Sequence, residues 1–417
     1  MKHAPKLALF RTLPLFRKLA FSGLMIAAAW APALAQKQYD TGVTDTEIKI
    51  GNIMPYSGPL SAYGITGRAE AAYFRKLNAD GGINGRKITF ISYDDAYTPP
   101  KSVEQARKLV ESDEVLLIVG ALGTPTNTAI HKYMNAKKVP QLFVQSGASK
   151  WNDPSEFPWT MGWPPSYQNE ARIYAKYILK EKPNARIAVL YQNDDFGKDY
   201  LKGLKDGLGA RAASMIVAEE AYEVAEPTID SHVVKMKSLN ADVLVDVTTA
   251  KFTSQAIKKA AEIGWKPLHF VSNVSTSIGS IIRPAGIENA QGIISVAYLM
   301  DALDPQWKDD PGMKAFDEFL AHDFPEGNRA DDRIMLGYNL AQTLAQVLRQ
   351  CGDNLTRENV MREAANLRDF RATNLLPGIS INTSAIDFAP IKQVQLRRLA
   401  GETWELFGPT LSSEIGN

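Results

Sequence analysis

Short apolar runs alternate with amphipathic segments along most of this chain. Apolar and polar residues alternate over 47–53, as in a half-buried strand, and apolar residues then recur near helical spacing over 69–77. The same succession continues with expected strands or helices at 87–93, 101–112, 116–119, 128–130 and 139–144. Strands that alternate with helices at this spacing predict βαβ units and a mostly parallel sheet.

The segment 151–165 interrupts this rhythm. It contains three tryptophans and four prolines and has no regular period. After it the alternation resumes, with helices expected near 167–180, from 196, at 229–239 and at 253–263, and strands at 187–191, 213–218, 243–247 and 269–272. We therefore predict a second α/β lobe and interpret 151–165 as a crossover between lobes.

The first 35 residues differ in character from the rest of the chain. Five positive side chains lie within the first 18 residues, an apolar run spans 19–30, and Ala33-Leu34-Ala35 follows. A basic start, an apolar centre and an Ala-x-Ala end predict a secretory signal peptide over residues 1–35, which would be cleaved after Ala35. The expected location of the product is the periplasm.

Composition and charge exclude some classes of protein. The 417 residues include 47 Lys and Arg against 46 Asp and Glu, and loss of the five early basic residues would leave 42 against 46. A mildly acidic product gives no electrostatic case for nucleic acid as a partner. Cys351 is the sole cysteine, so no intramolecular disulfide can form; we expect it to pack at a helix end.

The usual sequence signatures of catalysis are missing. There is no Gly-x-Ser-x-Gly, His-Glu-x-x-His, Walker or paired-cysteine metal motif. The acidic pairs 94–95 and 194–195 end predicted strands and could serve as acids, bases or metal ligands, although adjacent carboxylates at such places more often cap helices. We predict a binding protein, not an enzyme, and expect no catalytic residue, metal or cofactor.

The stretch 116–130 is the most informative for binding. Its apolar run passes through a loop of small and hydroxyl residues into a helical pattern. Such a loop lies at the carboxyl end of a parallel strand, where open α/β sheets bind ligands. The free N–H groups and the positive end of the helix dipole suit a carboxylate. An ordinary capped turn is the alternative.

Several longer motifs occur in a fixed order. They are IGNIMPYSGP at 50–59, NADGGING at 78–85, YDD at 93–95 and AVLYQNDDFG at 188–197. With them the chain resembles, over about 45–409, the periplasmic branched-chain amino-acid-binding (leucine/isoleucine/valine-binding) proteins, which are solute receptors of ABC transporters. The resemblance implies two Rossmann-like α/β lobes with parallel sheets, joined by a three-strand hinge, which is the type I periplasmic binding protein fold. Lobe 1 would comprise 45–160 and 301–388, and lobe 2 would comprise 161–300 and 389–417.

The resemblance also implies a ligand site between the lobes. In the family, the loops after the strands at 116–119 and 139–144 hold the ligand carboxylate, and aromatic side chains from each lobe form walls. We expect the site to be formed by residues of these loops and walls and of the segments 159–167, 247–250 and 272–275. They are Tyr63, Gly123, Thr124, Ser146, Gly147, Ala148, Ser149, Trp163, Phe196, Thr249 and Asn273.

Some positions depart from the pattern of the family. The amino-acid binders carry an acidic residue in the loop after the strand at 269–272, where it pairs with the ligand ammonium, but here 272–275 reads Ser-Asn-Val-Ser. A tyrosine expected after 243–247 is replaced by Thr-Thr-Ala, and the positions of a small disulfide are Tyr97 and Gly123. A buried ammonium without a counter-charge is costly. We therefore predict an aromatic or aliphatic organic acid as ligand.

Three functions stay open at this point. The favoured one is a monomeric receptor that closes about its hinge on a small carboxylate and delivers it to ABC permease subunits in the inner membrane. A receptor for branched-chain or other amino acids, or a ligand-sensing regulatory protein on the same fold, is the alternative. A secreted hydrolase using one of the acidic pairs is the third.

Overall fold

The computed structural model describes residues 37–412, and the expected signal peptide lies outside this range. A five-stranded sheet contains the first part of the chain, and every neighbouring pair in it is parallel. In sheet order its strands are β3 (Lys87–Asp94), β2 (Glu47–Met54), β4 (Leu117–Val119), β5 (Gln141–Val144) and β6 (Thr160–Gly162). All residues of β4 and β5 are buried, as expected for central strands covered on both faces.

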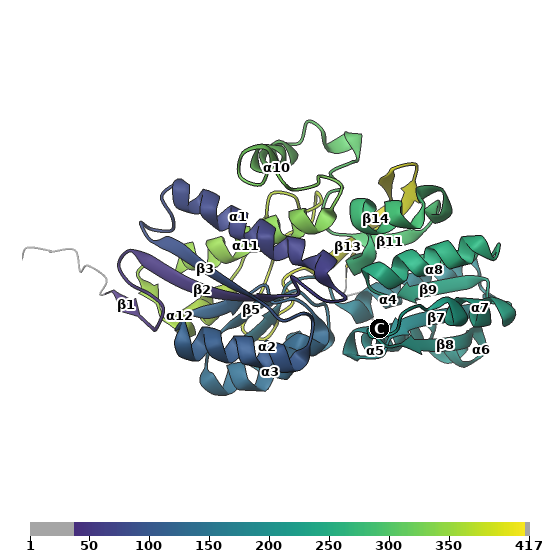
Figure 1. Ribbon diagram of the computed structural model, residues 1–417, viewed down its shortest axis with the longest axis horizontal. Coiled ribbons are helices and arrows are strands. Elements are labelled where there is room, and N and C mark those ends of the chain that lie inside the picture. Colours follow the sequence, from purple (N-terminus) through teal and green to yellow (C-terminus); the bar gives the residue numbers. More distant parts are fainter. Residues whose placement is uncertain (1–36, 413–417) are drawn as a thin grey trace, which may run out of the picture. The chain divides into compact units, whose positions relative to one another are not determined.

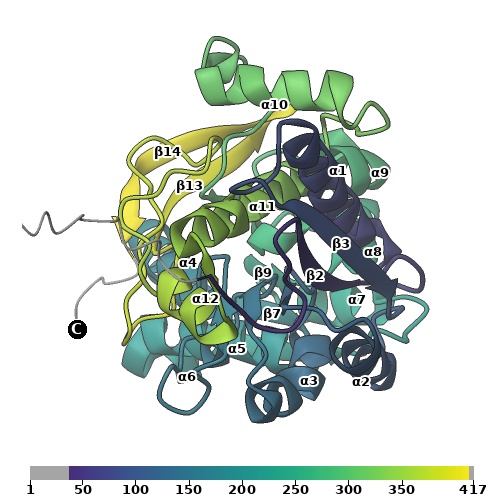
Figure 2. The ribbon, with the colours of Figure 1, turned by 90° about the vertical axis from the view of Figure 1, so that its left-hand side faces the viewer.

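Helices cover both faces of this sheet. Figure 1 shows α1 and α11 on one side and α2 and α3 on the other, and in Figure 2 α11 lies between α1 and α12. Their bounds are α1 (Ile65–Ala79), α2 (Pro99–Arg107), α3 (Thr124–Lys137), α11 (Asp332–Cys351) and α12 (Arg357–Ala364). Cys351 is the last residue of α11 and is buried, in agreement with its expected place.

A seven-stranded sheet contains most of the remaining strands. Its order is β14 (Thr403–Ser412), β13 (Gln393–Ala400), β11 (Ile294–Ala297), β10 (Leu268–Val271), β9 (Val243–Val247), β7 (Ile187–Gln192) and β8 (Ile216–Tyr222). The strands from β11 to β8 are parallel, whereas β13 and β14 are antiparallel to their neighbours. This arrangement confirms the predicted α/β fold with parallel sheets.

The central strands of the second sheet are apolar on both faces. In β7, Ile187 and Val189 pack with α4 (Tyr167–Glu181) and α5 (Asp195–Leu208). Ala188 and Leu190 pack instead with α7 (Asp230–Ser238) and α8 (Ala250–Glu262). Because side chains alternate along a strand, a run that is apolar throughout must be covered by helices on each side.

Three short elements differ from the expectations. The predicted strand 213–218 is instead the helix α6 (Ala212–Met215) followed by β8, because the alanines favour helix and β8 is an edge strand containing glutamates. The segment 151–165 contains β6, which is too short to give a periodic signal. The expected polar leader contains β1 (Gln38–Tyr39), which pairs with the distant β12 (Asn354–Leu355).

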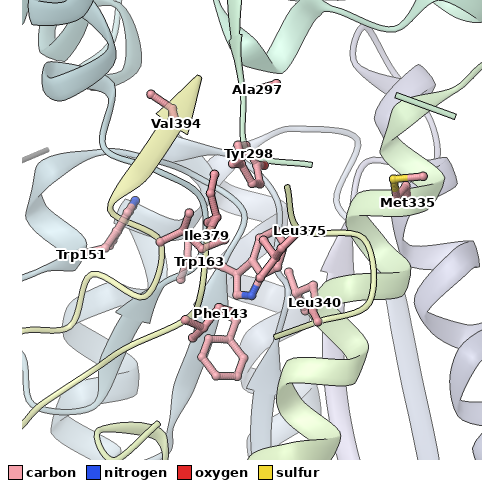
Figure 3. Close-up of a cluster of buried hydrophobic side chains, with 14 of the residues drawn as sticks. Phe143, Trp151, Trp163, Ala297, Tyr298, Met335, Leu340, Leu375, Ile379 and Val394 are labelled. Atoms are coloured by element: carbon pink, nitrogen blue, oxygen red, sulfur yellow. The ribbon is translucent and has the colours of Figure 1, made fainter. Parts of the chain in front are cut away.

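The chain passes between the two sheets three times: after β6, after β11 and before β13. The second and third passages are joined by hydrogen bonds, since Met300 N–H donates to Asn374 O at 2.9 Å and Leu376 N–H donates to Tyr298 O at 2.9 Å. Trp163, on the first passage, has its ring centroid 5.9 Å from that of Tyr298 (Figure 3). The three passages thus pack into one hinge core. Within residues 37–412, no helix is long and apolar enough to cross a membrane.

Candidate functional site

A cavity lies at the strand-end loops of both sheets. Its volume is about 100 Å³, on a scale in which a single water needs roughly 10–15 Å³, so it can hold a small organic molecule. It is lined by Leu60, Tyr63, Thr66, Tyr97, Leu122, Gly123, Thr124, Gln145, Pro164, Tyr167, Phe196, Thr249, Asn273, Val274, Val296, Ala297, Tyr298, Leu299, Met300, Asp332, Arg333, Leu336 and Arg397.

The start of α3 reaches the cavity wall through Gly123 and Thr124. Gly123 is the N-cap residue, so no N-cap side chain accepts hydrogen bonds from the N–H groups of the first turn. The hydroxyl of Thr124 shares a hydrogen bond of 2.7 Å with that of Ser146. This helix start therefore offers the dipole and N–H groups that the sequence predicted for a carboxylate.

The loop after β5 supports α3 and does not line the cavity with its expected residues. Ser146 is buried and accepts from Trp151 Nε1 at 2.8 Å, so its oxygen is held by the core. A Cβ on Gly147 would lie 2.2 Å from the carbonyl oxygen of Pro165. Ala148 is buried, whereas Ser149 is exposed and its N–H donates to Asp199 at 2.6 Å. These four residues lie beside the predicted site, not on its wall.

The two expected aromatic residues, Tyr63 and Phe196, both line the cavity. The Tyr63 hydroxyl accepts from the N–H of Ala250 at 3.0 Å and donates to Val274 O at 3.1 Å. Tyr63 precedes α1, beside the five-stranded sheet, whereas its two partners follow strands of the seven-stranded sheet. This side chain therefore joins the two halves of the protein over the cavity.

Tyr97 adds an aromatic wall that the residue expectations did not include. A Cβ on Gly123 would lie 2.4 Å from the Tyr97 ring, so the ring packs directly against the start of α3. These are the two positions at which the resemblance implies a disulfide in the family, and here they hold an aromatic ring and a glycine.

Trp163 lies in the hinge core beside Tyr298 (Figure 3). It is not among the residues that line the cavity. Its side chain is fully buried, and its indole N–H donates to Thr343 Oγ1 at 3.1 Å. The aromatic surface expected from the segment 159–167 reaches the cavity through Pro164 and Tyr167 instead.

Thr249 and Asn273 line the side of the cavity formed by the seven-stranded sheet. The backbone N–H of Asn273 donates to Glu170 Oε1 at 2.9 Å, and its side-chain amide donates to the other oxygen of the same carboxylate. Burial raises the pKa of Glu170. An acid thus lies behind Asn273 and holds it in place, but it is absent from the residues that line the cavity.

Charged side chains meet the cavity at an end that the sequence did not predict. Asp332 and Arg333 belong to the first turn of α11, and Arg397 belongs to β13. Asp332 accepts from the Thr276 hydroxyl at 2.8 Å and lies 3.8 Å from Arg397 Nη2, and its burial raises its pKa. One feature of the sequence could have indicated this end of the cavity. A cation in the first turn of a helix interacts unfavourably with the helix dipole, so Arg333 is expected there only if it has a role other than stabilising the helix.

A model of a family described as periplasmic binding protein matches residues 47–402. The chain belongs to this family. The leucine-specific-binding protein of Salmonella typhimurium is 23% identical over 341 residues, covering 81% of this chain and 87% of that protein. A Leu/Ile/Val-binding protein homolog of Brucella abortus is 25% identical over 354 residues, covering 82% and 86%.

Two solved structures show the same fold. A branched chain amino acid ABC transporter protein of Thermus thermophilus with bound valine has a TM-score of 0.79 at 16% identity, covering 89% of this chain and 98% of that one. A fatty acid ABC transporter substrate-binding protein of Thermomonospora curvata has a TM-score of 0.77 at 19% identity, covering 91% and 95%. The resemblance read from the sequence is confirmed. This periplasmic binding protein, like its relatives, is a solute receptor and not an enzyme.

Proposed function

We propose that this periplasmic binding protein is the receptor of an ABC importer and that it binds an aromatic or aliphatic organic acid. One observation carries the proposal: the start of α3 faces a cavity whose walls are otherwise largely apolar or aromatic. The first-turn N–H groups and the Thr124 hydroxyl can donate hydrogen bonds to a carboxylate, and the rings of Tyr63, Tyr97 and Phe196 can cover an apolar body. Release of the acid to permease subunits would follow opening of the hinge.

A branched-chain amino acid is the second candidate. Asp332 favours it, because this carboxylate lines the cavity and could pair with an ammonium. Asp332 is already engaged, however, by the Thr276 hydroxyl and by Arg397. Arg333 also lines this end of the cavity, so an ammonium placed there would meet two like charges. An acid without an amino group therefore fits the site better.

The proposal includes closure of two lobes on the ligand. Contacts between segments of the two sheets already flank the cavity, for example Tyr63 with Ala250 and Ser149 with Asp199. Such contacts are of the kind that a hinge motion would break and remake. We assign 45–160 and 301–388 to one lobe, 161–300 and 389–417 to the other, and export to the segment 1–35.

A thermal-shift screen tests the ligand class. The full mature chain would be heated with a panel of aromatic acids, aliphatic acids and amino acids. A ligand present at a hundred times its Kd raises the free energy of unfolding by about 2.7 kcal/mol, which is readily detected. We expect the stabilising compounds to be acids without an amino group. Stabilisation by amino acids alone would contradict the proposal.

Replacement of Thr124 by alanine tests the α3 end of the cavity. Ser146 accepts from Trp151, so its own hydroxyl can donate to Thr124 Oγ1. The Thr124 hydroxyl is then available to donate to a ligand oxygen. We expect Thr124→Ala to weaken acid binding by about 1–3 kcal/mol, the range for a hydrogen bond to a charged group. Isothermal titration calorimetry would measure it.

Thr128→Ala is the matched control for this variant. Thr128 lies one turn further along α3, donates to the Thr124 carbonyl oxygen at 2.7 Å and does not line the cavity. Its replacement should leave the affinity unchanged. Equal affinities for wild type and Thr124→Ala would remove Thr124 from the site.

A further inference from the structure

Asp332, Arg333 and Arg397 line one end of the cavity, and the Thr276 hydroxyl is bonded to Asp332 and Arg397. We call these four residues the α11 pole. Asp332 and Arg333 are the first two residues of α11, a helix of 20 residues whose N-terminus carries the positive end of its dipole. Thr276 and Arg397 come from the side of the seven-stranded sheet, and Arg397 Nη2 donates to the Thr276 hydroxyl at 2.5 Å. The α11 pole thus combines a helix start with two cations.

Both arginines of the α11 pole are buried and incompletely bonded. Their exposed fractions are 5% for Arg333 and 6% for Arg397. Among residues 37–412, neither Arg333 Nη1 nor Arg397 Nε has a hydrogen-bond partner. A buried donor on a charged group is costly to leave unsatisfied, so such groups normally have a partner. The two free N–H groups are therefore places where a ligand acceptor would be stabilised.

The remaining bonds hold the two guanidinium groups in fixed positions. Asp331 accepts from Arg333 Nε at 2.8 Å and from Nη2 at 2.7 Å, and the guanidinium carbon lies 4.9 Å from the Tyr63 ring centre. The guanidinium carbon of Arg397 lies 4.7 Å from the Trp404 ring centre. A planar guanidinium group that is stacked on a ring and bonded along one edge is already held in place. Its other edge can bind a ligand with little further loss of side-chain entropy, which favours binding.

The charges of the α11 pole are unequally matched. Arg333 has a bidentate partner in Asp331, whereas the carboxylate nearest to Arg397 is that of Asp332 at 3.8 Å, beyond hydrogen-bond distance. An incoming anion at this pole would find a cation that no protein carboxylate fully neutralises.

We propose that the ligand is a dicarboxylic acid, with one carboxylate at the start of α3 and the second at the α11 pole. This inference rests on the proposed function, because it requires that the cavity binds an organic acid. The apolar and aromatic residues that line the cavity, among them Leu122, Phe196 and Leu336, would cover the spacer. The two carboxylates are recognised differently: hydroxyl and backbone N–H groups hold one, and guanidinium groups hold the other.

Calorimetry with matched acids tests the inference on the wild-type protein. The pairs are hexanoate with adipate, and 3-phenylpropanoate with 3-(4-carboxyphenyl)propanoate, which differ only in the second carboxylate. We expect the diacid of at least one pair to bind about 10- to 100-fold more tightly, as one charge-assisted hydrogen bond would allow. Monoacids that bind as tightly as their diacids would overturn the inference and leave the proposed function intact. Binding of amino acids with no binding of any acid would instead overturn the proposed function.

The variant Arg397→Gln locates the second carboxylate. It should reduce the affinity for the diacid to that of the monoacid and leave the monoacid affinity within about threefold, since only one pole is altered. Arg398→Gln is the matched control, because Arg398 is exposed, adjoins Arg397 in β13 and donates to Tyr177 outside the cavity. A diacid preference that persists in Arg397→Gln, with a native melting curve, would contradict the assignment. If that variant does not fold, the wild-type comparison of acids still decides.

Discussion

The imidazole of His131 lies in a buried aromatic group on α3. Its ring is stacked on Phe157 with centroids 3.8 Å apart and meets Trp151 edge-on at 5.0 Å. Burial, with a smaller contribution from Lys150, lowers its pKa from 6.5 to about 4, while Asp153 acts in the opposite direction. His131 is therefore neutral in the folded protein and serves packing rather than chemistry.

This neutral histidine makes stability depend on pH. Between about pH 4 and 6.5 the unfolded chain binds a proton at His131 that the folded protein does not, so stability rises with pH through this window and falls as acid is added. We expect the wild type to lose roughly 3 kcal/mol more than His131→Phe between pH 7 and pH 4, from about 1.4 kcal/mol per pH unit. Urea unfolding at several pH values would measure the difference. Parallel pH profiles for the two proteins would contradict this account of His131.

Asp332 shows at the same scale why the chemistry of the site was only partly predictable. The loop around Asn273 has no acid, as the sequence shows, and Glu170 behind it is bonded to that asparagine. Yet an acid and two arginines reach the cavity from α11 and β13, far along the chain. No local pattern indicates that residues 332 and 397 meet, because only the packing of α11 and β13 brings them together.

Among the elements, the start of α3 depends on one glycine. Gly123 has φ of 102°, a conformation that side chains rarely adopt, and the Tyr97 ring occupies the space of its missing Cβ. The βα loop could be identified from the sequence because it is continuous in the chain. The reason for its glycine could not, since Tyr97 follows a different strand.

We expect Gly123→Ala to destabilise the protein more than Gly401→Ala. Gly401 has φ of 60°, and a Cβ added there would meet nothing within 4 Å, so alanine has only the backbone cost of about 1–2 kcal/mol. Gly123→Ala adds a clash with Tyr97 and should cost about 1–3 kcal/mol more. Denaturant unfolding of both variants tests this difference. Equal losses would show that the Tyr97 contact is not rigid.

Elements with a clear local pattern were predicted well and those without one were not. Strand β2 and the mainly apolar strands β4, β7 and β9 have clear patterns, because buried strands are apolar over most of their length. The three-residue β6 and the two-residue β1 have too few residues for a period. Both are defined by pairing with a strand elsewhere, which the local sequence does not contain.

For the whole molecule, the two-lobed α/β fold followed from the alternation of strands and helices and from the family resemblance. The placement of individual site residues did not follow as closely. Several predicted residues do line the cavity, because they lie in loops or helix starts that follow strands of the two sheets. They are Tyr63, Thr124, Phe196, Thr249 and Asn273. The loop 146–149 and Trp163 do not line the cavity. The loop packs against α5 and Pro165, and Trp163 packs in the hinge core.

The central claim is that the cavity binds an acid and not an α-amino acid. Leucine and 4-methylpentanoate test it most directly, since the two molecules share one skeleton and differ in the amino group. Their affinities for the full mature protein would be measured side by side by isothermal titration calorimetry at neutral pH. The account predicts that 4-methylpentanoate binds more tightly, by about tenfold or more, because the loop 272–275 offers no carboxylate to pair with the ammonium of leucine. Tight binding of leucine with none of 4-methylpentanoate would contradict it.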